Sequence, residues 1–291
     1  MTPEEQAAQD RIKRIAEQQA ALEARVKAMQ NKLLDLVLNK ADTWLLKPQQ
    51  LELAFAEFNK AELLPVVSQW ANDLLRGTQD NAAYFKAVAA GEEIKDFAAI
   101  SAEAKSLVLD RFGMTASGKL TKKGFFDTVI NDRALLRKVA DQSWQLKSSG
   151  AGVDEYKRSL KSLIQGDPKG KGLVERHLDT FAYDTYNSSD AATQAFYAEK
   201  LNLTAALYLG GTIAGTRDFC RQRNGKVFLL SEIENWAELK FAGKTKPYTP
   251  LLDRGGYRCR HAFNFITDKQ AVRRDKTLKI NASGKIERVD L

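Results

Sequence analysis

The residues best suited to chemistry lie in the last third of the sequence. Cys220 and Cys259 are the only two cysteines of the chain, and His261 is one of its two histidines. Two thiolates and an imidazole are ligand types that zinc prefers, and a Cys-x-His pair can present both side chains on one side of an extended strand. A structural zinc site takes four ligands, and Asp218 or a water molecule could supply the fourth. The pattern indicates a zinc site but leaves two other states of the cysteines open, a buried reduced pair and a disulfide.

Arginines flank both cysteine motifs. They are Arg217, Arg221, Arg223, Arg254, Arg258 and Arg260, with Phe219, Tyr257 and Phe263 between them. Guanidinium groups in such clusters suit phosphate and carboxylate partners. We therefore expect a surface that binds phosphate or an acidic partner, and a solvated basic face is the alternative. The arginines expected to form this surface are Arg217, Arg221, Arg223, Arg258 and Arg260.

The net charge of the protein belongs to the same region. The chain has 291 residues and a formal net charge of +8. Residues 206–291 hold 17 Lys+Arg against 9 Asp+Glu, so the remaining residues balance to zero. A pI near 9.3 favours an acidic partner, either nucleic acid or an acidic protein face. The longest mainly apolar stretches, such as Leu33–Leu38 with Asp35 inside it, are too short to span a bilayer, so we expect no membrane span.

Signatures of enzymes are mostly absent from the sequence. Ala242-Gly243-Lys244-Thr245 ends like a phosphate-binding loop, but Glu238 stands where the first glycine of that motif belongs. Neither a Gly-x-Ser-x-Gly elbow nor a His-Glu-x-x-His helix occurs. Cys220 and His261 could form a nucleophile and its base, but a structural role is favoured. We therefore expect no enzymatic activity.

The first forty residues predict one long helix. Thr2-Pro3-Glu4-Glu5 has a hydroxyl cap, proline at the first helical position and a glutamate three residues after the cap. Apolar residues then recur at steps of three and four, with only Gln19 interrupting the stripe, which predicts a coiled coil or bundle with a helix of this chain or of a neighbouring one. The alternative is a long helix lying on its own domain. The residues expected to form an oligomeric seam are Ile15, Leu22, Val26, Met29 and Leu33.

The rest of the sequence predicts a mainly α-helical fold with a small α+β C-terminal module. The expected segments are a coiled-coil-like helix over 1–40, a helical domain over 41–202, the module over 203–268 and a basic tail over 269–291. Strands are expected at 207–213 and 225–230, where apolar runs follow turn signals. One further strand pair is expected in the tail, around Leu278–Ile280 and Ile286–Val289.

The order of the motifs resembles that of a known family. Thr216-Arg217-Asp218-Phe219-Cys220 is followed by Gly225-Lys226-Val227, by Glu232-Ile233-x-x-Trp236 and by Gly255-Gly256-Tyr257-x-Cys259-Arg260-His261. This order is similar to the C-terminal module of phage minor head proteins, the Mu F-like head-morphogenesis family of tailed phages. The similarity is close over about 60 residues, general over 80–200, and does not extend to 1–78. Ala214 or Gly215 replaces the family's aspartate ahead of Thr-Arg, so the role of that carboxylate does not carry over.

The resemblance implies a virion structural protein without enzymatic activity. Such a protein is made in the host cytoplasm and lies in the head interior or at the portal vertex, in a few copies per particle. Its implied partners are the portal protein, the major capsid protein and phage DNA, and its implied roles are head assembly and DNA packaging or ejection. The alternative that the charge distribution favours is a basic nucleic-acid-binding protein.

Overall fold

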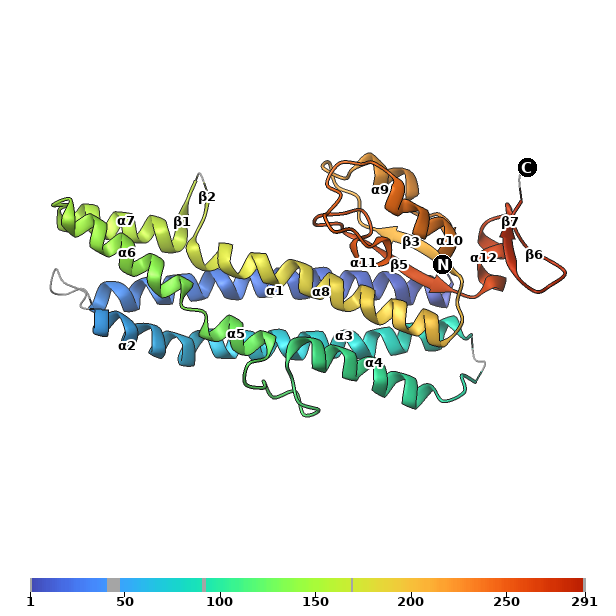
Figure 1. Cartoon of the computed structure of the whole chain (residues 1–291), viewed down its shortest axis with the longest axis horizontal. Coiled ribbons are helices and arrows are strands. Elements are labelled where there is room, and N and C mark those ends of the chain that lie inside the picture. Colours follow the sequence, from blue (N-terminus) through green and yellow to red (C-terminus); the bar gives the residue numbers. More distant parts are fainter. Residues whose placement is uncertain (1, 41–47, 91–92, 169, 290–291) are drawn as a thin grey trace. The chain divides into compact units, whose positions relative to one another are not determined.

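The computed structural model describes residues 2–40, 48–90, 93–168 and 170–289 (Figure 1). Most of these residues are helical, and a small sheet-containing part follows in the C-terminal region, which confirms the predicted mainly α-helical fold. Within this described part of the chain, no helix has both the length and the apolarity needed to cross a bilayer.

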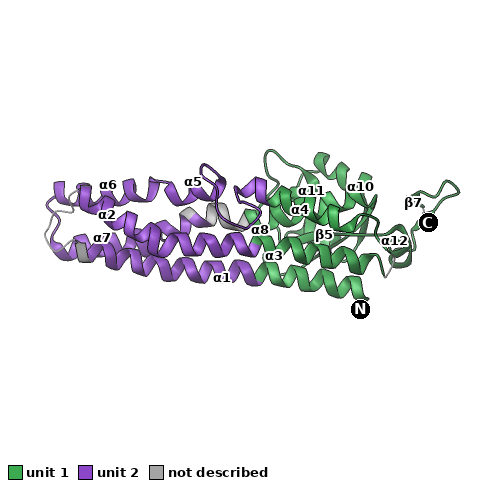
Figure 2. Cartoon of the chain, turned by 90° about the horizontal axis from the view of Figure 1, so that it is seen from below, with its two compact units in different colours: residues 1–16, 74–108, 184–291 green, residues 17–73, 109–183 purple. Residues whose placement is uncertain are grey.

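The chain divides into two compact units, each assembled from separate stretches of sequence (Figure 2). This division differs from the four consecutive segments expected from the sequence, because the long helices continue from one unit into the other. Unit 1 comprises residues 1–16, 74–108 and 184–291, and unit 2 comprises residues 17–73 and 109–183.

The N-terminal helix α1 spans Pro3–Lys40 and begins at the predicted cap. The backbone N–H of Glu5 donates to the Thr2 hydroxyl over 3.4 Å, and the N–H of Thr2 donates to a carboxylate oxygen of Glu5 over 2.8 Å. These reciprocal bonds satisfy backbone donors that a helix start leaves unpaired.

Unit 2 is a helical bundle with an aromatic core. Trp70 is fully buried, and its ring contacts Phe125 and Phe126 edge-on at centroid distances of 6.1 and 5.1 Å. Besides part of α1, the unit contains α2 (Pro48–Phe58), the π-helix η1 (Asn59–Leu63), α5 (Phe125–Asn131), α6 (Ala134–Ser148), α7 (Val153–Gln165), β1 (Gly166–Asp167), β2 (Gly170–Lys171) and parts of α3 (Leu64–Val88), α4 (Phe97–Phe112) and α8 (Leu173–Lys200).

The apolar stripe of α1 is covered within the chain itself. Of the predicted seam residues, Leu22, Val26, Met29 and Leu33 are buried and Ile15 is half-buried. Because these side chains already pack inside one molecule, the structure contradicts their assignment to an oligomeric seam. It agrees instead with a bundle inside the chain, the other arrangement that the heptads allowed.

Polar bonds from the same helix show which elements of unit 2 lie beside it. Arg25 pairs with Asp73 of α3 at 3.5 Å, and Lys32 pairs with Glu62 of η1 at 2.7 Å. On another side, the Gln165 amide of α7 donates to Asn31 over 2.7 Å. The α1 segment of unit 2 is therefore bonded to neighbours on more than one face.

A three-stranded antiparallel sheet forms the base of the C-terminal part of unit 1. Its central strand β3 (Ala205–Gly210) lies between β4 (Val227–Leu229) and β5 (His261–Ile266). Strands β3 and β4 correspond to the predicted strands at 207–213 and 225–230. Short helical segments connect the strands: α9 (Asp218–Arg223), α10 (Leu230–Glu234), η2 (Asn235–Glu238) and α11 (Pro250–Asp253).

Residues 269–289 of the expected basic tail are folded into unit 1. It forms α12 (Asp268–Arg274) and the predicted strand pair, observed as β6 (Leu278–Ile280) and β7 (Ile286–Arg288). The guanidinium of Arg288 pairs with Glu232 near the sheet and with Asp275 at 2.9 Å. This double ion pair fixes the hairpin to the remainder of the unit.

A buried ion pair crosses the interior of unit 1. Arg11 of α1 is 1% exposed, and its guanidinium pairs with Asp190 of α8 and donates to the Asn264 side chain of β5 over 2.6 Å. Asn81 of α3 donates to Asp190 over 3.3 Å, and Gln194 donates to Asn81 over 2.5 Å. This network joins three helices to strand β5.

Replacement of Leu22 by Asp tests whether the α1 stripe is an internal core. We expect Leu22→Asp to lower the free energy of unfolding by about 3–5 kcal/mol, because it removes a buried side chain and buries a carboxylate. The control Leu53→Asp, at a leucine on α2 that is 64% exposed, should change it by about 0.5 kcal/mol or less. Urea unfolding followed by circular dichroism measures both values. A Leu22→Asp variant of unchanged stability that turned an oligomer into a monomer would restore the oligomeric seam.

Candidate metal centre

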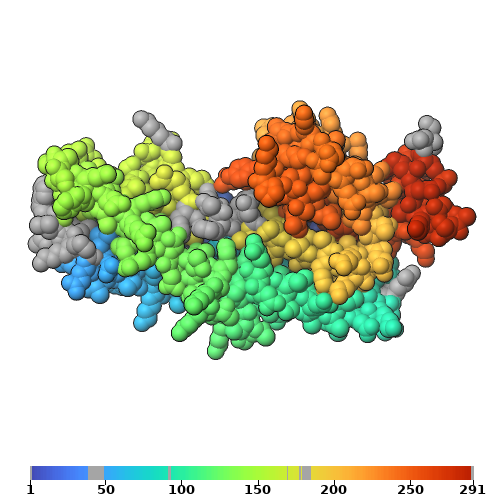
Figure 3. Space-filling model, viewed as in Figure 1, coloured from blue at the N-terminus to red at the C-terminus, as the bar shows by residue number. Residues whose placement is uncertain are grey.

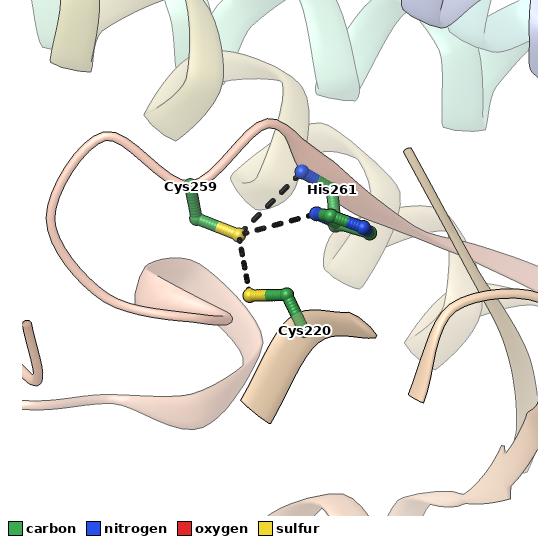
Figure 4. Close-up of side chains that lie close together, drawn as sticks. All are labelled: Cys220, Cys259 and His261. Carbon is green, nitrogen blue, oxygen red and sulfur yellow. Dashed lines mark hydrogen bonds between the residues drawn. The ribbon is translucent and has the colours of Figure 1, made fainter. Parts of the chain in front are cut away.

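Three elements of unit 1 bring Cys220, Cys259 and His261 together (Figure 4). Cys220 lies in the short helix α9, Cys259 lies in the loop between α11 and β5, and His261 is the first residue of β5. Their exposed fractions are 2%, 6% and 2%. The two cysteine motifs, which lie 39 residues apart in the sequence, thus meet in the interior.

The distances between the donor atoms fit a tetrahedral metal ion. The two sulfurs are 3.8 Å apart, and Nδ1 of His261 lies 4.0 Å from the sulfur of Cys259. A tetrahedral zinc ion with Zn–S bonds of about 2.3 Å would place two sulfurs about 3.8 Å apart and sulfur and nitrogen about 3.6 Å apart. The sulfurs therefore already have the required spacing, and Nδ1 of His261 lies a few tenths of an ångström farther from the sulfur of Cys259 than such an ion requires.

Both cysteines are free thiols in the structure. A disulfide would hold the sulfurs at about 2.05 Å, far closer than they are. Of the three states considered from the sequence, the reduced pair and the metal-bound pair agree with this spacing. The structure therefore supports a group that could hold a metal ion.

The two thiols differ in their tendency to ionise. Hydrogen bonding with Cys220 is the main cause that lowers the pKa of Cys259, and the His261 ring and the charge of Arg254 act in the same direction. The same hydrogen bond, together with burial, raises the pKa of Cys220. Cys259 is thus the cysteine that ionises more readily, and the thiolate is the form of cysteine that binds metals.

The backbone of Gly255 packs closely against the two sulfurs. A Cβ atom on this residue would lie 2.2 Å from the sulfur of Cys220, 2.8 Å from that of Cys259 and 3.1 Å from the hydroxyl of Tyr208. No side chain can occupy that position without displacing these groups. The absence of a side chain at Gly255 therefore allows the two sulfurs and the phenol to lie this close to the backbone.

Asp218, one of the two candidates for the fourth ligand, does not join the site. It is the first residue of α9, and its side chain is 85% exposed beside Arg221. The cluster of Cys, His, Asp and Glu donors found among the described residues contains Cys220, Cys259 and His261 alone. The expectation for Asp218 is wrong because the first residue of the helix points to solvent while Cys220 points inward.

The arginines expected to bind phosphate or a partner separate into two groups. Arg217 and Arg223 make contacts within the module. Arg217 donates to the backbone carbonyl of Gly255 over 3.2 Å and to that of Tyr257. The guanidinium of Arg223 lies 3.9 Å from the centroid of the Phe219 ring. The exposed members are Arg221, Arg258 and Arg260. The structure thus leaves these three at the surface, where an anionic partner could reach them.

The sequence showed Arg254 only as one of the flanking arginines and gave Tyr208 no role. Arg254 is 3% exposed and donates to the carbonyl of His261 over 2.9 Å and to that of Asn187 over 2.8 Å. Tyr208 is fully buried, and its hydroxyl lies 3.5 Å from the sulfur of Cys220 and 3.4 Å from that of Cys259. Tyr208 and Gly210 are two residues apart on β3 and therefore face the same side of the sheet, and Gly210 pairs with His261. This two-residue spacing is the signal that could have indicated the tyrosine.

No family model, curated protein or solved structure matches the chain. What the site can do therefore follows from its own residues and their geometry.

Replacement of Gly255 by Ala tests the close packing around the sulfurs. We expect Gly255→Ala to lower the free energy of unfolding by about 1–3 kcal/mol, because the added methyl group overlaps the sulfur of Cys220. The control Gly211→Ala adds a methyl group with nothing within 4 Å and should leave stability nearly unchanged. Thermal unfolding of the metal-free proteins compares the two variants. Equal stabilities would show that the space beside the sulfurs is larger than the structure indicates.

Proposed function

We propose that the chain is a virion structural protein of a tailed phage whose C-terminal module is held together by a zinc ion. The ion would bind Cys220, Cys259 and His261 and would have a structural rather than an enzymatic role. The protein would be a minor head or portal-associated component that acts in head assembly and in DNA packaging or ejection.

The burial and origin of the donors support a structural ion. The three donor residues are at most 6% exposed and come from a helix, a loop and a strand. A bound ion would link parts of the chain that are distant in sequence, and structural zinc sites are closed to solvent in this way. Zinc is the metal that two cysteine sulfurs and one imidazole fit best among the common ions.

The zinc proposal predicts one bound ion per chain and a loss of stability when it is removed. At free zinc about 1,000-fold above the dissociation constant, binding should contribute about 4 kcal/mol to the free energy of unfolding. Native mass spectrometry and thermal unfolding with and without a chelator measure both effects. Cys220→Ser and Cys259→Ser should lose the ion, whereas Asp218→Asn, at the exposed carboxylate beside the site, should keep it. A wild-type chain that neither carries zinc nor gains stability from added zinc would contradict the proposal.

The observation that carries the virion proposal is that the motifs of the resemblance form one physical unit. Arg217 of the first motif donates to the carbonyls of Gly255 and Tyr257 of the last one. Trp236 of the third motif packs edge-on against Phe219 of the first, with ring centroids 5.0 Å apart. Residues that resemble the family's motifs therefore contact one another in space, which supports the proposal that they act as one module.

The exposed basic residues support an acidic partner for this module. Arg221, Arg258 and Arg260 are exposed, and Tyr257 beside them is 56% exposed. Portal protein, major capsid protein and DNA phosphates are the partners we propose for this surface. The proposed location is the head interior or the portal vertex, after synthesis in the host cytoplasm. Since the α1 stripe is internal, contacts with other subunits would use such exposed side chains.

A stop codon in the gene tests the virion proposal. Mass spectrometry of purified particles should detect the chain in the wild-type phage, and the mutant should yield fewer DNA-filled heads or particles that fail to eject DNA. The matched control is the same mutant phage grown in a host whose suppressor tRNA reads through the stop codon and restores the chain. Absence of the chain from purified particles would contradict the proposal. If the free chain then bound DNA with a steep salt dependence that weakened in Arg258→Ala/Arg260→Ala, the nucleic-acid-binding alternative would replace it.

A further inference from the structure

We infer that Tyr208 supplies the fourth ligand of the metal centre, through its phenolate oxygen. This inference rests on the proposed zinc centre and completes it: two sulfurs, one imidazole nitrogen and one phenolate oxygen around one ion. On binding, the bond from the ion to the oxygen replaces the O–H bond, and the phenol proton passes to solvent.

The position of the phenol oxygen is that of a tetrahedral corner. It lies 3.5 Å from the sulfur of Cys220 and 3.4 Å from that of Cys259. With Zn–S bonds of about 2.3 Å and a Zn–O bond of about 2.0 Å, tetrahedral geometry separates sulfur and oxygen by about 3.5 Å. Both measured distances agree with this value, as the distance of 3.8 Å between the sulfurs agrees with the sulfur–sulfur edge.

The surrounding rings hold the phenol in this position. Tyr208 lies on the central strand β3 and is 0% exposed. Its ring stacks on the His261 ring with centroids 5.0 Å apart and planes inclined by 11°, and the edge of Trp236 packs against it at 5.4 Å. A ligand that is immobilised before the ion binds loses little conformational freedom on binding. The same packing leaves the ring no solvent-facing alternative.

Other donors do not compete for this corner. Asp218 is directed to solvent, and the described residues provide no fourth Cys, His, Asp or Glu to the cluster. On the side of Gly255, the backbone of the glycine itself approaches the sulfurs, since a Cβ there would lie only 2.2 Å from Cys220. The phenol oxygen is thus the protein donor already in contact with both sulfurs.

Two arginines compensate the negative charge of such a centre. Two thiolates and one phenolate around Zn²⁺ carry a net charge of −1, which is costly in the interior unless it is paired. Both guanidinium groups are fixed by backbone carbonyls, Arg254 by that of His261 and Arg217 by that of Gly255. The site is therefore flanked by positive charge.

Ultraviolet difference spectroscopy on addition of Zn²⁺ tests the inference. The wild-type chain should develop the absorption of one ionised tyrosine per bound ion, and Tyr208→Phe should bind zinc without this band. The affinity of Tyr208→Phe for zinc should fall by roughly 10- to 100-fold or more. Loss of a residue that only hydrogen-bonds to a zinc ligand already has an effect of this size. The matched control is Tyr84→Phe, because Tyr84 is equally buried but its hydroxyl donates to the carbonyl of Phe265. This control should keep both the band and the affinity.

The outcomes separate this inference from the zinc proposal itself. Zinc binding by the wild-type chain without the tyrosine band, with unchanged affinity in Tyr208→Phe, would overturn the inference and leave the zinc centre standing. A wild-type chain that binds no zinc would overturn both. If Tyr208→Phe fails to fold, X-ray absorption at the zinc edge of the wild-type chain tests the inference without any variant. We expect two sulfur ligands, one imidazole and one phenolate. A water ligand in the fourth position would contradict the inference.

Discussion

The buried pair of Arg11 and Asp190 is the interaction on which unit 1 depends most. Both side chains are buried, so their ion pair must have favourable geometry to offset the free energy lost with their hydration. Because Arg11 also donates to Asn264 and to the carbonyl of Phe263, the pair sets where strand β5 lies against the helices. His261 begins that strand. A residue of the first helix thus helps to position a candidate ligand of the possible metal centre.

Local sequence signals predicted much of the fold. The cap at Thr2, Pro3 and Glu5 marked the start of α1, and apolar runs bounded by turn residues marked β3, β4 and the hairpin of β6 and β7. These elements depend on short-range physics, namely capping and alternation along the chain. The grouping of Cys220, Cys259 and His261 was also predictable, since few other residues of the chain offer soft ligands.

Features that depend on distant residues were not predictable from the pattern. The heptads of α1 specify an apolar stripe, but they do not state which helix covers it, and here the chain covers it itself at Leu22 and Leu33. Asp218 has a suitable chemical type, yet its place at the start of α9 directs it to solvent. The roles of Arg254 and Tyr208 arise only when β3 and β5 pair and bring these side chains beside the cysteines.

Strand β5 lies at an edge of its sheet, where backbone groups are normally free to pair with another strand. Here the outward carbonyl of Phe263 accepts from Arg11, and that of Phe265 accepts from the Tyr84 hydroxyl over 2.8 Å. Side chains from α1 and α3 therefore occupy the acceptors that an incoming strand would use. Strand addition between copies of the protein is therefore blocked at the β5 edge, which closes this edge to one common route of amyloid-like aggregation.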